Sequence, residues 1–277
     1  MNPALARRLW AAIEPLHGVI YFNPEGSAVA GLKGFWMGYV AGRVAPVGSV
    51  DASTGHALFF AFSRRRIARA LPDAWSFSSP ADVVSARLAA GAAILRRALP
   101  GLDPSPLTEL LEDAIEGCSF EGRALAAGWS SVPRPEDPVA RLWLAATVLR
   151  EHRGDGHVMA VVHHGLSGLE AGVTHVATGR VSREQIQTSR AWTDEEWSDA
   201  VRRLAARGLL DESGGLTRSG EKLRRDIEES TDRLAVIGLG NAATEAAIAL
   251  AAPLSDHLFA TGVFPESTPI GLRRAAP

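Results

Sequence analysis

The chain has 277 residues, of which 46% are hydrophobic and 22% charged, with a formal net charge of −2 and a single cysteine. This composition is typical of a soluble globular protein with one large domain or two of ordinary size. The lone Cys118 excludes a disulfide framework and a thiolate zinc site, and it favours a reducing, cytoplasmic compartment. The 29 basic residues are balanced by 31 acidic ones, so the chain lacks the overall positive field of a typical nucleic-acid binder.

No stretch of the chain has the roughly 18 uninterrupted apolar residues of a membrane span. The residues that follow Met1 also lack the apolar segment of a secretory signal. We therefore expect no membrane partner and no secretion.

An internal repeat indicates two copies of one helical module. Arg8-Leu9-Trp10 recurs as Arg141-Leu142-Trp143, and further blocks recur in the same order. They are Gly31-Leu32 with Gly168-Leu169, Gly42-Arg43-Val44 with Gly179-Arg180-Val181, and Arg65-Arg66-Ile67-Ala68 with Arg202-Arg203-Leu204-Ala205. Because a repeat organises the whole fold, we divide the chain accordingly. The division is an N-terminal module over 1–100, a helical linker over 101–137, a C-terminal module over 138–240, and a final helix and tail over 241–277.

In the first copy, one helix is expected from His56 to Leu71 and another over 81–99, with a Pro- and Ser-containing stretch between them. The linker is bracketed by proline-rich segments and should hold one or two short helices. This copy lacks the glycine turn that would give it a hairpin.

The second copy has clearer signals for where helices begin and end. Asp137-Pro138 predicts a helix start, and Gly154-Asp155-Gly156 predicts its end, followed by a short helix over 157–165. Capping residues predict the next helices, which are 168–178 after Ser167, 183–190 after Ser182, and a helix from Thr193 to Gly208. A Ser-Gly-Gly turn predicts a two-stranded hairpin over 209–217, and Thr217 begins a helix through Leu234. A last helix is expected over 241–261.

Two segments carry a resemblance to winged-helix proteins of the MarR-like kind. They are Leu204-Ala205-Ala206-Arg207-Gly208-Leu209-Leu210 and Leu216-Thr217-Arg218-Ser219-Gly220-Glu221-Lys222-Leu223. The whole chain also resembles an actinobacterial family that carries a helix-turn-helix label and has no established activity. The resembling strings are 16–25, 34–39 and 149–157. The resemblance implies a mainly α fold in which two pseudo-repeated winged-helix-like modules pack as one unit, with a small β-hairpin wing in the second.

The expected recognition helix argues against DNA as a partner. In a winged helix, the N-terminal residues of this helix lie near base edges and phosphates. Here the helix begins with Asp194, Glu195 and Glu196, with Asp199 one turn later, and the wing carries Asp211-Glu212. These carboxylates would repel a polyanion, so DNA is a disfavoured partner, although acidic residues also suit any helix N-terminus.

A first polar and aromatic string suggests a ligand site. His17 and Tyr21 are four residues apart, and Trp36, Tyr39 and Arg43 are spaced by three and four, so each set shares a helix face. Aromatic rings beside a guanidinium suit a planar or anionic small molecule. The alternative is that these residues belong to an amphipathic core.

A second string is rich in ionisable side chains. His152 or His157 could act as a general base oriented by Asp155, and Arg150 or Arg153 could stabilise an anion. The alternative is a helix C-terminus with favourable cations and a capping aspartate. The repeat aligns the two strings, so we expect His17 and Arg150 to lie near one cavity.

Other kinds of chemistry lack their signatures. No thiolate or carboxylate completes a metal-ligand spacing around His157, His163, His164 and His175, so no metal site is predicted. No nucleotide-binding glycine motif or nucleophile elbow is present, and the cofactor is unknown.

The sequence therefore favours a protein that binds a small molecule on a repurposed winged-helix scaffold, in a pocket of aromatic, His and Arg side chains between the two repeats. This prediction covers an enzyme of specialised metabolism. The alternative is a ligand-responsive MarR-like transcriptional regulator that binds DNA. The sequence leaves open whether the chain forms a homodimer.

Overall fold

A computed structural model describes residues 2–23, 25, 29–266, 268 and 272. The described chain is mainly helical, as predicted. Its α-helices are α1 (Pro3–Gly18), α3 (Gly34–Val44), α4 (Ala52–Phe59), α5 (Arg64–Ala68), α6 (Pro80–Ala98), α7 (Ser105–Glu116), α8 (Ala124–Ser130), α9 (Pro138–His163), α10 (Gly168–Val176), α11 (Arg183–Arg190), α12 (Asp194–Ala206), α13 (Arg218–Leu234) and α14 (Asn241–Ala260). Short 3-10 helices cover Val19–Tyr21, Val29–Gly31, Ala45–Val47 and Asp73–Ser76. No helix in this described part is long and apolar enough to cross a membrane.

The helix starts predicted after Asp137, Ser167, Ser182 and Thr193 are confirmed. The Asp137 carboxylate accepts from the backbone N–H of Val139 at the start of α9. Ser167, Ser182 and Thr193 each form a complete capping box, so two orphan N–H groups are satisfied at the start of α10, α11 and α12. These local hydrogen bonds explain why the sequence alone located the helices.

The hairpin predicted over 209–217 is reduced to a single antiparallel bridge between Leu210 and Leu216. The Asp211 carboxylate accepts hydrogen bonds from the N–H groups of Ser213 and Gly215, at 2.9 and 3.0 Å. The loop is therefore closed by a side chain, and few residues remain to form a ladder.

The break predicted at Gly154-Asp155-Gly156 is wrong, because α9 continues through it to His163. The separate short helix over 157–165 belongs mostly to the same α9. A Cβ atom at Gly156 would lie 2.6 Å from Nη1 of Arg123, so this glycine leaves room for a neighbouring side chain. The helix keeps its path because both of its ends are anchored in packed cores.

The single helix predicted from His56 to Leu71 is also wrong. The chain leaves α4 at Phe60, which has φ of +46°, and resumes as α5 at Arg64. The Ser63 N–H donates to the Arg190 carbonyl at 2.9 Å, and Trp192 Nε1 donates to the Ala61 carbonyl at 3.1 Å. The break therefore forms a junction with the second half of the chain.

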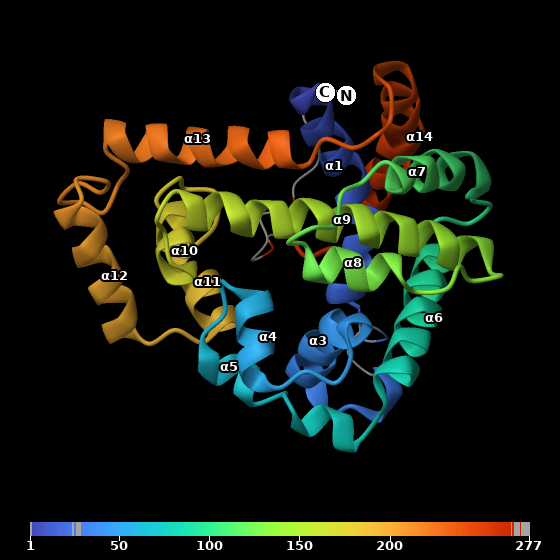
Figure 1. Cartoon of the computed structure of the whole chain (residues 1–277), viewed down its shortest axis with the longest axis horizontal. Helices are drawn as coiled ribbons and strands as arrows, with labels where there is room; N and C mark the ends of the chain where they lie inside the picture. Colours follow the sequence, from blue (N-terminus) through green and yellow to red (C-terminus); the bar gives the residue numbers. More distant parts are fainter. Residues whose placement is uncertain (1, 24, 26–28, 267, 269–271, 273–277) are drawn as a thin grey trace.

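Two hydrophobic clusters make up the core. The first lies among α1, α3, α6, α7, α8, α14 and the N-terminal part of α9, and the second lies among α10 to α13 and the C-terminal end of α9. Figure 1 shows α9 crossing the middle of the molecule, with α13 alongside it and α10 to α12 gathered at one end. Each cluster thus uses a different part of the same helix.

Candidate functional site

His17 lies at the buried contact between α1 and α9. Its Nδ1 is 2.9 Å from Oγ1 of Thr147, and its Nε2 is 2.8 Å from the Tyr21 hydroxyl. The Thr147 hydroxyl donates to the Trp143 carbonyl at 2.7 Å, so its single proton is used. Nδ1 of His17 is therefore the donor to Thr147, and Nε2 accepts from Tyr21.

The pKa values of this pair agree with that assignment. Burial, together with the charge of Arg150, lowers the pKa of His17 well below its ordinary range. Burial raises the pKa of Tyr21 to about 12, so the phenol keeps its proton. His17 is thus neutral and has both ring nitrogens hydrogen-bonded, and it is poorly suited to act as a base in this arrangement.

The aromatic residues of the first string lie against one another. The Tyr39 ring centroid lies 5.1 Å from that of Tyr21 and 5.7 Å from that of Trp36. The Arg66 guanidinium stacks over Trp36 at 4.0 Å, and Phe62 packs on Tyr39 at 5.7 Å. These rings form one wall that extends from the core to the junction between α4 and α5.

Arg43 and Arg150 meet at one buried carboxylate. Arg43 binds Glu151 with two hydrogen bonds of 2.8 and 2.7 Å, and Arg150 lies 3.1 Å from the same carboxylate and 3.4 Å from Glu14. Burial would raise the pKa of Glu151, but Arg43 and Arg150 outweigh it and hold that pKa far below its ordinary range. The structure thus brings together two strings that are more than 100 residues apart.

Arg153 forms its contacts away from Glu151, with residues of α1 and α13. Its Nη1 lies 2.9 Å from Oδ1 of Asp232 on α13, and its guanidinium lies 4.7 Å from the centroid of the Trp10 ring. It therefore links α9 to both α1 and α13 and does not join the cluster around Glu151.

His152, Asp155 and His157 each contact a different partner. His152 Nε2 donates to the Ser119 carbonyl at 3.1 Å, and the Asp155 carboxylate accepts from the Ala126 N–H at 3.0 Å. His157 Nδ1 is 3.0 Å from the Thr231 hydroxyl on α13. No hydrogen bond joins the three to one another in the described chain.

Burial shifts the pKa of all three of these groups. It lowers the pKa of His152 to about 4, with help from Arg123, and lowers that of His157 to about 4. It raises the pKa of Asp155 to about 6. A base oriented by Asp155, as the sequence suggested, would need contacts that this arrangement lacks, so the catalytic role of these residues stays a prediction.

Sequence reasoning missed Arg87 on α6. Its side chain is 1% exposed, and its Nε and Nη2 have no hydrogen-bond partner. The guanidinium lies 5.3 Å from the centroid of the Tyr21 ring and 5.8 Å from that of Trp143. A signal was present, because Arg87 occupies the same helix face as the buried residues Val83, Gly91 and Ile94.

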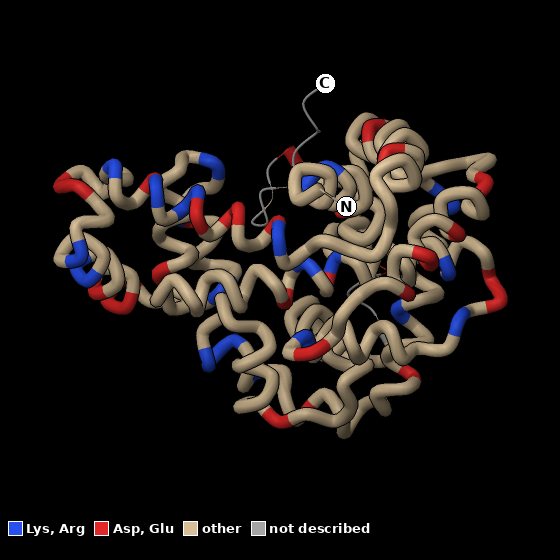
Figure 2. The backbone as a smooth tube through the Cα atoms, turned by 45° about the horizontal axis from the view of Figure 1, so that its top comes forward, with Lys and Arg blue, Asp and Glu red and all other residues tan. Residues whose placement is uncertain are grey.

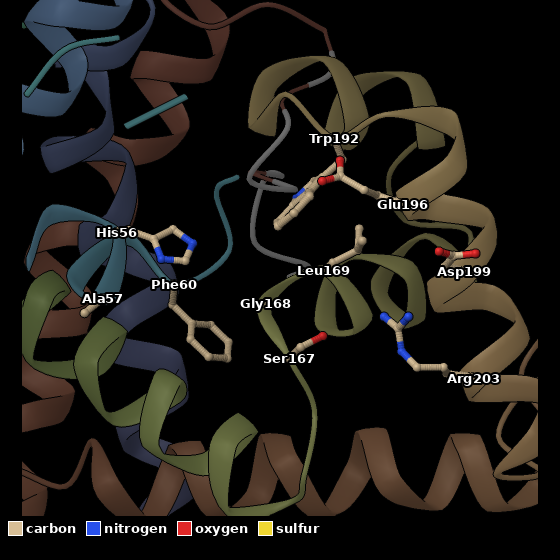
Figure 3. Close-up of a pocket in the computed structure, with 10 residues that line it drawn as sticks. All are labelled: His56, Ala57, Phe60, Ser167, Gly168, Leu169, Trp192, Glu196, Asp199 and Arg203. Carbon is tan, nitrogen blue, oxygen red and sulfur yellow. The ribbon is translucent and has the colours of Figure 1, made fainter. Parts of the chain in front are cut away.

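A cavity of about 410 Å³ lies at the junction between the two halves of the chain (Figure 3). His56 and Phe60 line one side, Trp192 and Glu196 line the other, and the start of α10 lies between them. A Cβ atom at Gly168 would lie 2.0 Å from the Phe60 carbonyl oxygen, so glycine is required for this close contact.

The N-terminal end of α12 is held by ion pairs. Arg65 of α5 binds Glu196 through two hydrogen bonds of 3.0 and 2.6 Å, and Arg183 lies 2.6 Å from Asp194. Basic and acidic residues are interspersed along the tube in Figure 2, including α12 and α13. The end of the helix that would face DNA is therefore acidic and partly joined to the first half.

In comparisons with known proteins, the model of a helix-turn-helix family matches residues 6–265. No curated protein and no solved structure shows a significant match to the chain. Among the described residues, no group of three or more His, Cys, Asp or Glu side chains is placed to hold a metal ion.

Proposed function

The chain belongs to this helix-turn-helix family, and we propose that it uses the scaffold to bind a small molecule at the aromatic and arginine cluster between α1, α3 and α9. The observation that carries the proposal is the joining of His17, Tyr21 and Tyr39 with Arg43 and Arg150. Aromatic faces and bidentate guanidinium groups are the usual means of holding a planar or anionic ligand.

The proposal is tested by native mass spectrometry of the purified protein, before and after denaturation. We expect a mass above that of the chain which is lost on unfolding, and the released molecule identifies the ligand. A Tyr39→Leu variant that folds should retain less of it. A wild-type protein that carries only its own mass after purification, and gains none from a cell metabolite extract, contradicts the proposal.

A second candidate is the MarR-like regulator that binds DNA, and it is supported by the match to a helix-turn-helix family. Its test is selection of bound sequences from random duplexes, followed by fluorescence anisotropy. A regulator should bind a selected site with Kd of roughly 10⁻⁸ M or tighter at physiological salt. Binding no tighter than roughly 10⁻⁶ M on every sequence is only a non-specific phosphate interaction and rejects this candidate.

We also propose that 1–100 and 138–240 are two copies of one winged-helix-like module, joined by the linker 101–137 and followed by 241–277. Support comes from α1 and α9, which carry the repeated Arg-Leu-Trp blocks and pack against each other. The bridge of Leu210 with Leu216 is then a shortened wing.

A further inference from the structure

Arg87 presents an uncompensated charge inside the molecule. Removing a guanidinium from water costs several kcal/mol unless an opposite charge and hydrogen bonds replace the solvent. Arg43 and Arg150 satisfy that condition with Glu151. Arg87 has no carboxylate within ion-pair distance in the described part of the chain, and two of its nitrogens have no acceptor.

The shortage of negative charge extends beyond Arg87. Arg190, at the end of α11, lies over the Phe62 ring at 4.4 Å and, among the residues described, also pairs with no carboxylate. Tyr21 and Phe62, the rings next to Arg87 and Arg190, both pack on Tyr39, with centroids 5.1 and 5.7 Å from that of Tyr39. The cluster thus holds Arg43, Arg87, Arg150 and Arg190 against the carboxylates of Glu14 and Glu151, and both carboxylates are already bound by Arg43 or Arg150.

The fold makes room for the Arg87 side chain. On α3, a Cβ atom at Gly42 would lie 2.8 Å from Nη1 of Arg87, so any larger residue would displace the guanidinium. The faces of Tyr21 and Trp143 supply cation–π attraction from the other side. Aromatic faces offset part of the cost of burial, but they accept no strong hydrogen bond from Nε and Nη2.

We propose that Arg87 binds an oxyanion, a carboxylate or phosphate group of the small molecule, through its Nε and Nη2 atoms. This inference rests on the proposed function and names the chemical class of its ligand. The Nε and Nη2 atoms form one edge of the guanidinium, which is the geometry that binds two oxygens of one anion. The aromatic wall of Tyr39 and Tyr21 would then receive the rest of the molecule.

The test uses the full chain, with inorganic phosphate and benzoate as probes in isothermal titration calorimetry and thermal unfolding. We expect at least one probe to bind and raise the melting temperature. Benzoate alone would identify an aromatic carboxylate, and phosphate alone a phosphorylated ligand. In Arg87→Met, affinity for the active probe should fall about tenfold or more, because a bidentate charged contact is lost. Arg87→Lys keeps the charge without the planar edge and should bind with intermediate affinity.

Two further comparisons separate a binding role from a structural one. Without probe, Arg87→Met should melt at or above the wild-type temperature, because the substitution removes an unpaired buried charge. The matched control is Arg153→Met, which removes the 2.9 Å ion pair with Asp232 and the contact with the Trp10 ring, and it should melt lower while its probe response is unchanged. If Arg87→Met is insoluble, Arg87→Lys and Arg153→Met still provide the comparison.

The inference is overturned if neither probe binds the wild type, or if Arg87→Met and Arg87→Lys respond as strongly as the wild type. Native mass spectrometry distinguishes this failure from that of the proposed function. A small molecule retained equally by wild type and Arg87→Met leaves the proposed function intact and removes Arg87 from it. No retained molecule and no probe response contradict both.

Discussion

Replacing Glu151 by Gln should destabilise the protein strongly, because the substitution removes the charge that compensates Arg43 and Arg150. The Glu151 side chain is fully buried and is contacted by both guanidinium groups at 2.7 to 3.1 Å. Removing one partner of a buried ion pair costs about 3–5 kcal/mol. With a shift of roughly 2–4 °C per kcal/mol for a protein of this size, the melting temperature should fall by roughly 6–20 °C.

The assay is urea unfolding at neutral pH, followed by circular dichroism. Glu245→Gln is the control, because Glu245 binds Arg8 with two hydrogen bonds of 2.6 and 2.9 Å on the surface, where a pair contributes about 0–1 kcal/mol.

The pKa of Glu151 in the folded protein lies below its value of 4.5 in the unfolded chain. The stability that the Glu151 carboxylate contributes is therefore fully present above about pH 4.5 and is lost as the pH falls towards the folded pKa. The difference between wild type and Glu151→Gln should therefore narrow in acid. Equal effects of Glu151→Gln and Glu245→Gln at neutral pH would refute the reasoning.

Three further predictions concern local structure. Burial raises the pKa of Asp155 from 3.8 to about 6, so the stability of the wild type falls as the pH rises between these values. Asp155→Asn should therefore become more stable relative to the wild type from about pH 4 to pH 7 in urea unfolding. A difference in stability that does not change with pH would contradict this prediction. Gly168→Ala should cost about 1–3 kcal/mol, because its Cβ meets the Phe60 carbonyl, whereas Gly240→Ala, with open space around it, should melt close to the wild type. Thr193→Ala removes the cap of α12 and should cost about 1 kcal/mol in thermal unfolding, and an unchanged melting temperature would count against a role for the capping box.

The sequence correctly predicted the helix starts that depend on residues nearby in the chain. It did not predict the helix boundaries that depend on contacts with residues far away in the chain. Ser167, Ser182 and Thr193 marked helix starts correctly, because a cap acts within three residues. Gly156 was taken as a helix end, yet it accommodates Arg123 from another element. The break at Phe60 depends likewise on contacts with residues 190–192, which no local pattern reveals.

The same limit applies to the candidate site. Helical spacing correctly grouped Trp36, Tyr39 and Arg43 on one element, but it gave no information about the carboxylate that binds Arg43. Glu151 lay inside the second string and was passed over in favour of its histidine neighbours. Arg87 required knowledge of which face of α6 is buried and of what that face meets.

Helix α9 has a mechanical consequence for the whole molecule. Its 26 residues span about 39 Å, from packing in the first hydrophobic cluster to packing in the second. Glu151 and Arg153 lie near its middle, where the helix also contacts α3 and α13 through ion pairs. Because one continuous helix contributes to both clusters, the clusters are joined by helical backbone as well as by side-chain packing.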